Sequence, residues 1–123
     1  MTPFLVLSMV FLHIVDDFCL QPIILNKLKQ RSWWEQNASN PLYRHDYIMA
    51  LLMHSISWCF MIMLPVAYSL NFDITGKFLL AFAVNTIIHG LTDHIKANKG
   101  LINLITDQGI HLIQIAVTAS IFT

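Results

Sequence analysis

The fold class is decided by the first apolar run, residues 3–25, which reads PFLVLSMVFLHIVDDFCLQPIIL. About 20 mostly apolar residues cross the hydrocarbon core of a bilayer as an α-helix, and this run is long enough. No lysine or arginine precedes it and no small-residue cleavage site is visible, so we predict a retained transmembrane helix rather than a signal peptide. A break is expected near its end, at Gln21-Pro22.

Three more apolar runs follow, at residues 47–70, 78–95 and 101–122. Polar turns at residues 71–76 and 98–100 are short, and turns this short place neighbouring helices antiparallel. The longest connection, residues 26–46, contains Trp33 and Trp34, which suit the headgroup level of a membrane interface. We therefore predict an all-α polytopic membrane protein, a single domain of residues 1–123 built as a bundle of four transmembrane helices.

The composition agrees with a membrane location. The chain has 123 residues, of which 56% are hydrophobic and 11% are charged. Soluble domains carry about 25% charged residues. The net charge is zero, whereas nucleic-acid binding requires a basic surface, so membrane lipids and not nucleic acids are the expected partners. The sequence leaves open whether the chain forms a homo-oligomer.

Lysine and arginine are distributed unevenly among the connections. The loop 26–46 holds Lys27, Lys29, Arg31 and Arg44, and two lysines flank the turn 98–100, whereas the turn 71–76 is followed by Lys77 alone. Basic residues accumulate in cytoplasmic loops. The pattern predicts that the first and third connections are cytoplasmic and that both termini lie outside a cytoplasmic (inner) membrane.

Each of the four runs contains a histidine, and three of these histidines have an aspartate four residues away. Residues four apart lie on the same face of an α-helix. In the antiparallel topology all of these side chains fall in the cytoplasmic half of the bilayer, where they are expected to converge. They are His13 with Asp17, His54, His89 with Asp93, and Asp107 with His111.

This constellation predicts a metal site. Ionisable groups at membrane depth cost several kcal/mol unless something pairs with them, and imidazole and carboxylate are ligands of divalent metals. Helix packing by hydrogen bonds is the simpler reading, but such contacts normally use Ser, Thr, Asn and Gln rather than three carboxylates. We predict that the seven residues bind a divalent metal, zinc first and manganese as the alternative. Asp16 and His94 lie off these faces; neither is expected to ligate, and Asp16 is expected behind the ligands or at an interface.

Residues 11–30, FLHIVDDFCLQPIILNKLKQ, resemble the opening of a family of small bacterial and phage membrane proteins, the domain of unknown function 3307 family. That opening is His-x-x-x-Asp-Phe-x-Leu-Gln followed by Asn-Lys. A histidine of the second helix, His-x-x-x-Asp-x-x-Lys and Asp-Gln-x-x-His are also similar, so the resemblance covers nearly the whole chain. It implies no activity; a looser analogy is to predicted membrane-bound metal-dependent hydrolases. The motifs fall on His13, Asp17, Phe18, Leu20, Gln21, Asn26, Lys27, His54, His89, Asp93, Lys96, Asp107, Gln108 and His111.

The leading functional hypothesis is a metal-dependent hydrolase or phosphotransferase that acts on a lipid or lipid-linked phosphate. Four histidines and three aspartates exceed what one tetrahedral zinc takes, which leaves room for a second metal or for a carboxylate base, Asp107 or Asp17. Gln108 is expected to orient a ligand without binding the metal. The residues expected to hold the phosphate at the cytoplasmic mouth are Gln21, Asn26, Lys27 and Lys96.

Two other functions remain open. A metal-stabilised membrane protein with a regulatory partner, for example one encoded by a phage, needs the same ligands but no turnover. Transport of protons or metal ions also suits a chain of histidine and aspartate. Transport ranks lowest, because the polar groups gather in one leaflet and a carrier needs a path across both.

Overall fold

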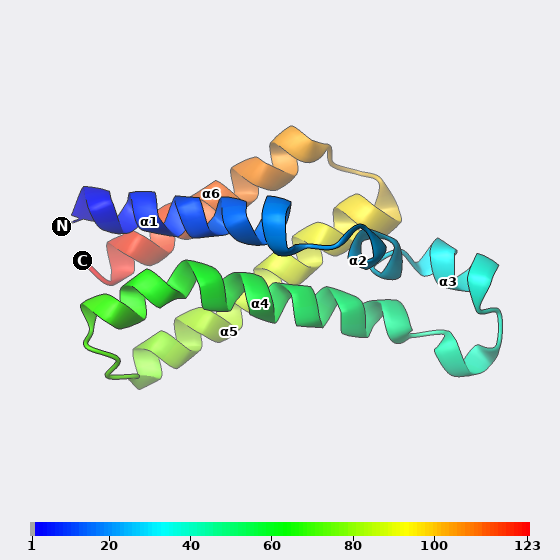
Figure 1. Ribbon diagram of the computed structural model, residues 1–123, viewed down its shortest axis with the longest axis horizontal. Helices are drawn as coiled ribbons and strands as arrows, with labels where there is room; N and C mark the ends of the chain where they lie inside the picture. The colour runs from blue at the N-terminus through cyan, green and yellow to red at the C-terminus, as the bar shows by residue number, and fades with distance from the viewer. Residues whose placement is uncertain (1) are drawn as a thin grey trace.

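The chain folds into a bundle of four long helices in the computed structural model, which describes residues 2–123 (Figure 1). These residues contain no β-strand, which confirms the all-α class. Each of the four helical stretches is long and apolar enough to span a membrane. They are α1 (Thr2–Ile14) continued by the π-helix η1 (Val15–Leu20), α4 (Asp46–Ser69), α5 (Gly76–His94) continued by the π-helix η3 (Ile95–Lys99), and α6 (Leu104–Ile121).

The helices pack as a ring in which each contacts two neighbours. α1 packs against α4 and α6, and α5 packs against the same two helices. The start of α1 and the end of α6 lie at one end of the bundle, while α2 and α3 lie at the other (Figure 1). The late residues of α1 and α5 therefore lie level with the early residues of α4 and α6.

The first membrane helix is shorter than the predicted run 3–25. It ends at Leu20, and the backbone of Gln21 is extended, with φ −80° and ψ 111°. A residue that precedes proline is disfavoured in the helical conformation, which explains a break before Pro22. The residues beyond it form two short helices and a 3-10 turn, so the connection 26–46 is largely helical. These elements are α2 (Ile23–Leu28), α3 (Arg31–Asn37) and η2 (Pro41–Tyr43).

Side-chain caps fix where the last two helices begin. Thr75 accepts a hydrogen bond from the backbone N–H of Phe78 at 3.2 Å. Asn103 accepts one from the N–H of Thr106 at 2.9 Å, so α6 begins at Leu104 and not at residue 101. Such caps satisfy backbone donors that have no partner within the helix.

The two π-helices change which side chains face the bundle. A π-turn is wider than an α-turn and is often found at functional sites. An α-helix separates adjacent residues by about 100° around its axis, so it cannot turn both Asp16 and Asp17 fully inward. Both aspartates lie in η1, where Asp16 is 2% exposed and the Asp17 side chain is 10% exposed. The wider turn explains why Asp16 is buried.

The two ends of the bundle bury different chemistry. The end that holds the termini, which we call the apolar half, contains a cluster of buried hydrophobic side chains. At the other end, the polar half, the buried side chains are mostly histidine and aspartate. Trp58 is fully buried between the two halves. The apolar cluster comprises Met9, Cys59, Ile62, Met63, Val66, Ala67, Phe78, Ile115 and Ala119, together with Trp58 at its border.

The first and third connections meet at the polar end. The side-chain amide of Asn98 donates to the carbonyl oxygen of Lys29 at 2.9 Å and accepts from the backbone N–H of Arg31 at 2.6 Å. The rings of Tyr47 and His94 stack nearby, with centroids 6.1 Å apart. These contacts place the two basic connections on the same side of the bundle, as the predicted topology requires.

Candidate metal centre

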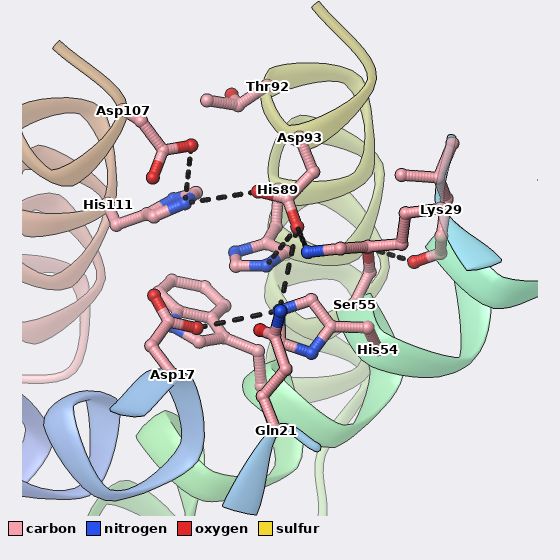
Figure 2. A network of polar contacts seen from close by, with 12 residues as sticks. Asp17, Gln21, Lys29, His54, Ser55, His89, Thr92, Asp93, Asp107 and His111 are labelled. Atoms are coloured by element: carbon pink, nitrogen blue, oxygen red, sulfur yellow. Dashed lines mark hydrogen bonds and ion pairs between the residues drawn. The ribbon is translucent and has the colours of Figure 1, made fainter. Parts of the chain in front are cut away.

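The predicted ligands come together in the polar half (Figure 2). The π-helix η1 supplies Asp17, α4 supplies His54, α5 supplies His89 and Asp93, and α6 supplies Asp107 and His111. His89 and His111 are 0% exposed, and the other side chains of the cluster are at least nine-tenths buried. Two overlapping groups have ligand atoms within 4.8 Å of one another. These groups are Asp17, His54 and His89, and His89, Asp93 and His111.

The nitrogen–oxygen distances within the cluster are too long for hydrogen bonds. Asp93 Oδ2 lies 3.5 Å from the Nε2 atoms of both His54 and His89, and Asp93 Oδ1 lies 3.6 Å from His111 Nε2. Asp107 Oδ1 lies 3.4 Å from the same His111 nitrogen. N–H···O hydrogen bonds measure about 2.7–3.2 Å. Two ligands that share a tetrahedral zinc, each about 2.0–2.1 Å from it, lie about 3.4 Å apart, and the cluster has this spacing.

The tautomer of His111 follows from its neighbours. The side-chain amide nitrogen of Gln114 donates to the backbone carbonyl of Asn85 at 3.1 Å. A carbonyl can only accept, so the amide oxygen of Gln114 must face His111 Nδ1, 3.0 Å away. Nδ1 therefore carries a proton. The opposite nitrogen, Nε2, faces the carboxylates of Asp93 and Asp107, where either a second ring proton or a bound metal ion can supply the positive charge.

A second directed chain fixes His13. The indole N–H of Trp58 donates to His13 Nδ1 at 2.8 Å, and His13 Nε2 lies 2.8 Å from the amide oxygen of Gln108. Indole is a donor only, so His13 carries its proton on Nε2 and donates it to Gln108. The amide nitrogen of Gln108 donates in turn to Asp17 Oδ2 at 3.2 Å and Asp107 Oδ2 at 3.0 Å. His13 lies outside both ligand groups, and these contacts engage both its nitrogens.

Those bonds leave the other carboxylate oxygens unpaired. Asp17 Oδ1 and Asp107 Oδ1 are buried without a hydrogen-bond partner, as is His111 Nε2. Both ring nitrogens of His89 are also unpaired, and its ring packs against the rings of Trp58 and His111, with centroid distances of 4.3 and 4.1 Å. Buried polar atoms are nearly always paired, so a group of unpaired acceptors indicates a missing cationic partner.

Asp16 lies beside His54. Its Oδ1 atom accepts a hydrogen bond from Ser57 Oγ at 2.7 Å, and its Oδ2 atom lies 3.8 Å from His54 Nδ1, too far for a hydrogen bond. The other ring nitrogen of His54, Nε2, faces Asp17 Oδ1 at 3.5 Å. Asp16 and Asp17 thus face different nitrogens of the same ring.

Close helix packing brings His54 and His89 together. A methyl group at Gly90 would lie 3.1 Å from the hydroxyl oxygen of Ser55, so α4 and α5 approach closely at this level. The rings of His54 and His89, the residues adjacent to this pair, have centroids 5.0 Å apart. The small side chains on both helices therefore set the spacing of two ligands.

One lysine enters the centre. Lys29 is 7% exposed, and its ammonium nitrogen donates to Asp93 Oδ2 at 3.1 Å (Figure 2). Lys96, on η3, is 39% exposed in its side chain and reaches to 3.6 Å from Asp107 Oδ2. Lys27 is exposed and has no ion pair within the part of the chain that the structure describes. Two lysines, Lys29 and Lys96, thus approach the carboxylates.

The other residues predicted at the mouth lie at the break after η1. The amide nitrogen of Gln21 donates to Asn26 Oδ1. This bond joins the extended residue before Pro22 to α2, and so helps to place the segment that carries Lys29. The substrate-binding roles of Gln21, Asn26 and Lys27 stay predictions.

Sequence reasoning did not find Trp58 and Lys29. Trp58 had a usable signal, because it follows His54 by four residues and so shares its helix face. Lys29 had none. It lies in a basic stretch with Lys27, and only the direction of α2 after Pro22 decides which of the two points inward.

A protein-family model matches residues 5–123, nearly the whole chain, and its description is protein of unknown function (DUF3307). The chain belongs to the DUF3307 family. No curated protein and no solved structure matches this DUF3307 chain. Family membership therefore supports the resemblance of the motifs, and the function has to be argued from the centre itself.

Proposed function

We propose that this DUF3307 protein is a membrane-embedded, metal-dependent hydrolase or phosphotransferase that acts on a lipid or lipid-linked phosphate. The proposal of a bound metal rests on the cluster of unpaired polar atoms at ligand spacing. In this cluster His111 Nε2 lies 3.6 Å from Asp93 Oδ1 and 3.4 Å from Asp107 Oδ1. Histidine and aspartate suit zinc, and manganese is the alternative. Cysteine does not contribute to either ligand group.

A phosphate is the substrate group that the charges favour. Lys29 and Lys96 bring two ammonium groups to the carboxylates Asp93 and Asp107. Cations that surround a transferring phosphoryl group stabilise the charge that develops in the transition state. Both lysines belong to the connections at the polar end, the expected entry side for a headgroup.

A lipid is the substrate class that the location favours. The centre lies among helices that can span a membrane. A groove of about 350 Å³ runs between α4 and α5. Its lining is mostly apolar and also includes Thr86, His94, and Ser55 and Gly90, the residues next to His54 and His89. We assign this groove to the hydrocarbon chain of the substrate, with its phosphate at the centre.

The reaction is a hydrolysis of a phosphate ester. A divalent ion held by Asp93, Asp107 and His111 would polarise a phosphoryl oxygen and would lower the pKa of a bound water to about 7. The water oxygen forms a bond to phosphorus and its proton passes to Asp107 Oδ2. The bond between phosphorus and the lipid oxygen breaks, and that oxygen leaves with the proton as an alcohol. The amide nitrogen of Gln108 orients Asp107 by a hydrogen bond to its Oδ2 atom at 3.0 Å. It also donates to Asp17, the other candidate base, at 3.2 Å.

Activity is tested on the full chain purified in detergent with a polyprenyl phosphate or a phosphatidate. We expect release of inorganic phosphate that needs Mn²⁺ or Zn²⁺ and stops with EDTA. Lys29→Met should lower the rate by about 10²-fold, because a charge at the phosphoryl group is lost. Lys27→Met should lower it less, and Lys99→Met, at the end of η3, should leave it unchanged. Full activity of Lys29→Met and of Asp107→Asn would contradict the hydrolase.

The full burial of His89 and His111 favours a second candidate, a metal clamp that ties the helices together for a regulatory interaction. Structural zinc sites are closed in this way. A clamp binds metal and gains thermal stability from it, but releases no phosphate from either lipid and tolerates Lys29→Met. Transport has less support, because the buried side chains of the apolar half are mostly hydrophobic, and Thr118, the polar one next to Ala119, is hydrogen-bonded to Asn85.

We further propose that the polar end faces the cytoplasm and both termini lie outside the cytoplasmic membrane. The support is that Lys77 is the sole lysine or arginine at the apolar end. In a background without Cys19 and Cys59, Asn71→Cys should react with an impermeant maleimide on intact cells and Ser39→Cys should react only after lysis. Labelling of position 39 on intact cells would reverse the orientation.

A further inference from the structure

We propose that the centre holds two divalent ions that share the carboxylate of Asp93. This inference rests on the proposed metal binding, and goes beyond it in number and arrangement. The two oxygens of Asp93 face different histidines: Oδ2 faces His54 and His89, each at 3.5 Å, and Oδ1 faces His111 at 3.6 Å (Figure 2). A carboxylate whose oxygens serve separate sets of nitrogen ligands is placed to bridge two ions.

The first position has four donors. Asp93 Oδ2 is joined by His54 Nε2, by His89 Nε2 and by Asp17 Oδ1, which lies 3.5 Å from His54. Asp17, His54 and His89 have ligand atoms within 4.8 Å of one another. Four is the number of donors that a tetrahedral zinc takes, and three of these residues, Asp17, His54 and His89, are already at mutual ligand spacing. Lys29 contacts Asp93 Oδ2 as well, since a carboxylate oxygen has lone pairs for both.

The second position is centred on His111 Nε2, which lies 3.6 Å from Asp93 Oδ1 and 3.4 Å from Asp107 Oδ1. Asp93 and His111 also have ligand atoms within 4.8 Å of His89. The side chains of His111 and Asp107 are 0% and 3% exposed, and these two facing atoms have no hydrogen-bond partner. Three protein ligands leave one coordination position open, as in catalytic zinc sites. The second position is therefore the one where water and a phosphoryl oxygen bind, and it is the one that Lys96 approaches.

The charges of the centre accommodate two ions once a phosphate is bound. Two divalent ions with Lys29 and Lys96 then balance the four carboxylates of Asp16, Asp17, Asp93 and Asp107 and a phosphate dianion. Two metals about 3.5–4 Å apart are the arrangement with which many phosphatases hold the attacking and leaving oxygens.

The number of ions is measured on the full chain in detergent, loaded with MnCl₂ and freed of excess ion. Elemental analysis should give two manganese ions per chain, and electron paramagnetic resonance should show two exchange-coupled ions. Asp107→Asn and Asp17→Asn should each retain one ion and give the hyperfine pattern of an isolated Mn²⁺. Asp93→Asn should lose the coupling and at least one ion. Asp73→Asn, in the exposed turn at the apolar end, is the matched control and should keep two coupled ions.

The outcomes separate this inference from the proposed function. One ion per native chain, with no coupling, overturns the pair of ions and leaves a metal-dependent enzyme standing. Two coupled ions in Asp107→Asn overturn the assignment of the second position. No bound ion in the native chain removes the metal centre and the proposed function together. The native measurement stands even where a variant does not fold.

Discussion

The apolar and polar halves of the bundle are built from the same four helices but are held together by different forces. In the apolar half, side chains such as Met9, Ile62 and Ile115 are 0–1% exposed and pack against one another. In the polar half, histidines and aspartates of equal burial lie 3.4–3.6 Å apart without hydrogen bonds. Hydrophobic contacts close one half, and the other half contains clusters of histidine and aspartate that could hold a metal ion. The molecule thus teaches that burial alone does not show what stabilises a bundle.

The largest expected effect is the difference between two substitutions on α6, one in the polar half and one in the apolar half. Ile115 and His111 are one turn apart on α6 and are both buried. His111→Ala should reduce bound metal to background or to a single ion and remove the stabilisation that metal provides. Ile115→Ala should lower the free energy of unfolding by about 2–5 kcal/mol through a cavity, with metal content unchanged. Elemental analysis and thermal unfolding with and without EDTA measure both. Equal metal loss in the two variants would erase the distinction.

The second effect concerns the hydrogen bonds that begin at Trp58, between the apolar and polar halves, and that orient the proposed ligands. Trp58→Phe keeps the ring that stacks on His89 but removes the N–H donor to His13 Nδ1. Without this donor, nothing fixes which atoms donate and which accept in the hydrogen bonds that run from His13 through Gln108 to Asp17 and Asp107. Metal affinity should therefore fall about 10–100-fold. Titration with a competing chelator measures it. Unchanged affinity would mean that His13 and Gln108 serve packing alone.

Gln114→Leu tests ligand orientation on the other side of the centre, at His111. It removes the acceptor at 3.0 Å from His111 Nδ1, so the tautomer with its lone pair on Nε2 is no longer fixed. We expect a loss of metal affinity of about 10-fold or more. Asn103→Ser, which keeps a capping side chain at the start of α6, is the control and should bind metal normally. A Gln114→Leu protein with native affinity would contradict the tautomer argument.

The smallest expected effect concerns helix spacing. Gly90→Ala places a methyl group 3.1 Å from Ser55 Oγ, and the hydroxyl can turn away with a small shift of α4. The free energy of unfolding should fall by about 1 kcal/mol. Metal affinity should fall several-fold because His54 and His89 move apart. Ser55→Ala in the same chain should restore both, and failure to do so would show that spacing does not control the ligands.

The convergence of the polar residues was predictable because it depends on local patterns. Hydrophobic length gives the helices, short turns give their direction, and a four-residue spacing places His89 with Asp93 on one face. Those three facts suffice to bring ligands of separate helices to one level, as Figure 2 shows. No long-range packing detail enters this argument.

Other features depend on backbone geometry that spacing does not reveal. The π-helix η1 turns Asp16 inward beside Asp17, although α-helical spacing separates the two. The direction of α2 after Pro22 brings Lys29, rather than Lys27, to Asp93. The role of Trp58 depends on which histidine nitrogen it meets across two helices. The first two depend on backbone geometry and the third on a contact between helices, so residue spacing alone gives only the helix face of Trp58 and not its partner.

The central claim is that buried histidine and aspartate side chains of the polar half bind a divalent metal. Zinc K-edge X-ray absorption of the purified full chain tests it most directly, because the spectrum reports the elements around the ion. We predict a shell of nitrogen and oxygen at about 2.0–2.2 Å with outer scattering from imidazole rings, and no sulfur at about 2.3 Å. A sulfur shell would place zinc on Cys19 or Cys59, and either that result or a protein that retains no zinc or manganese would contradict the claim.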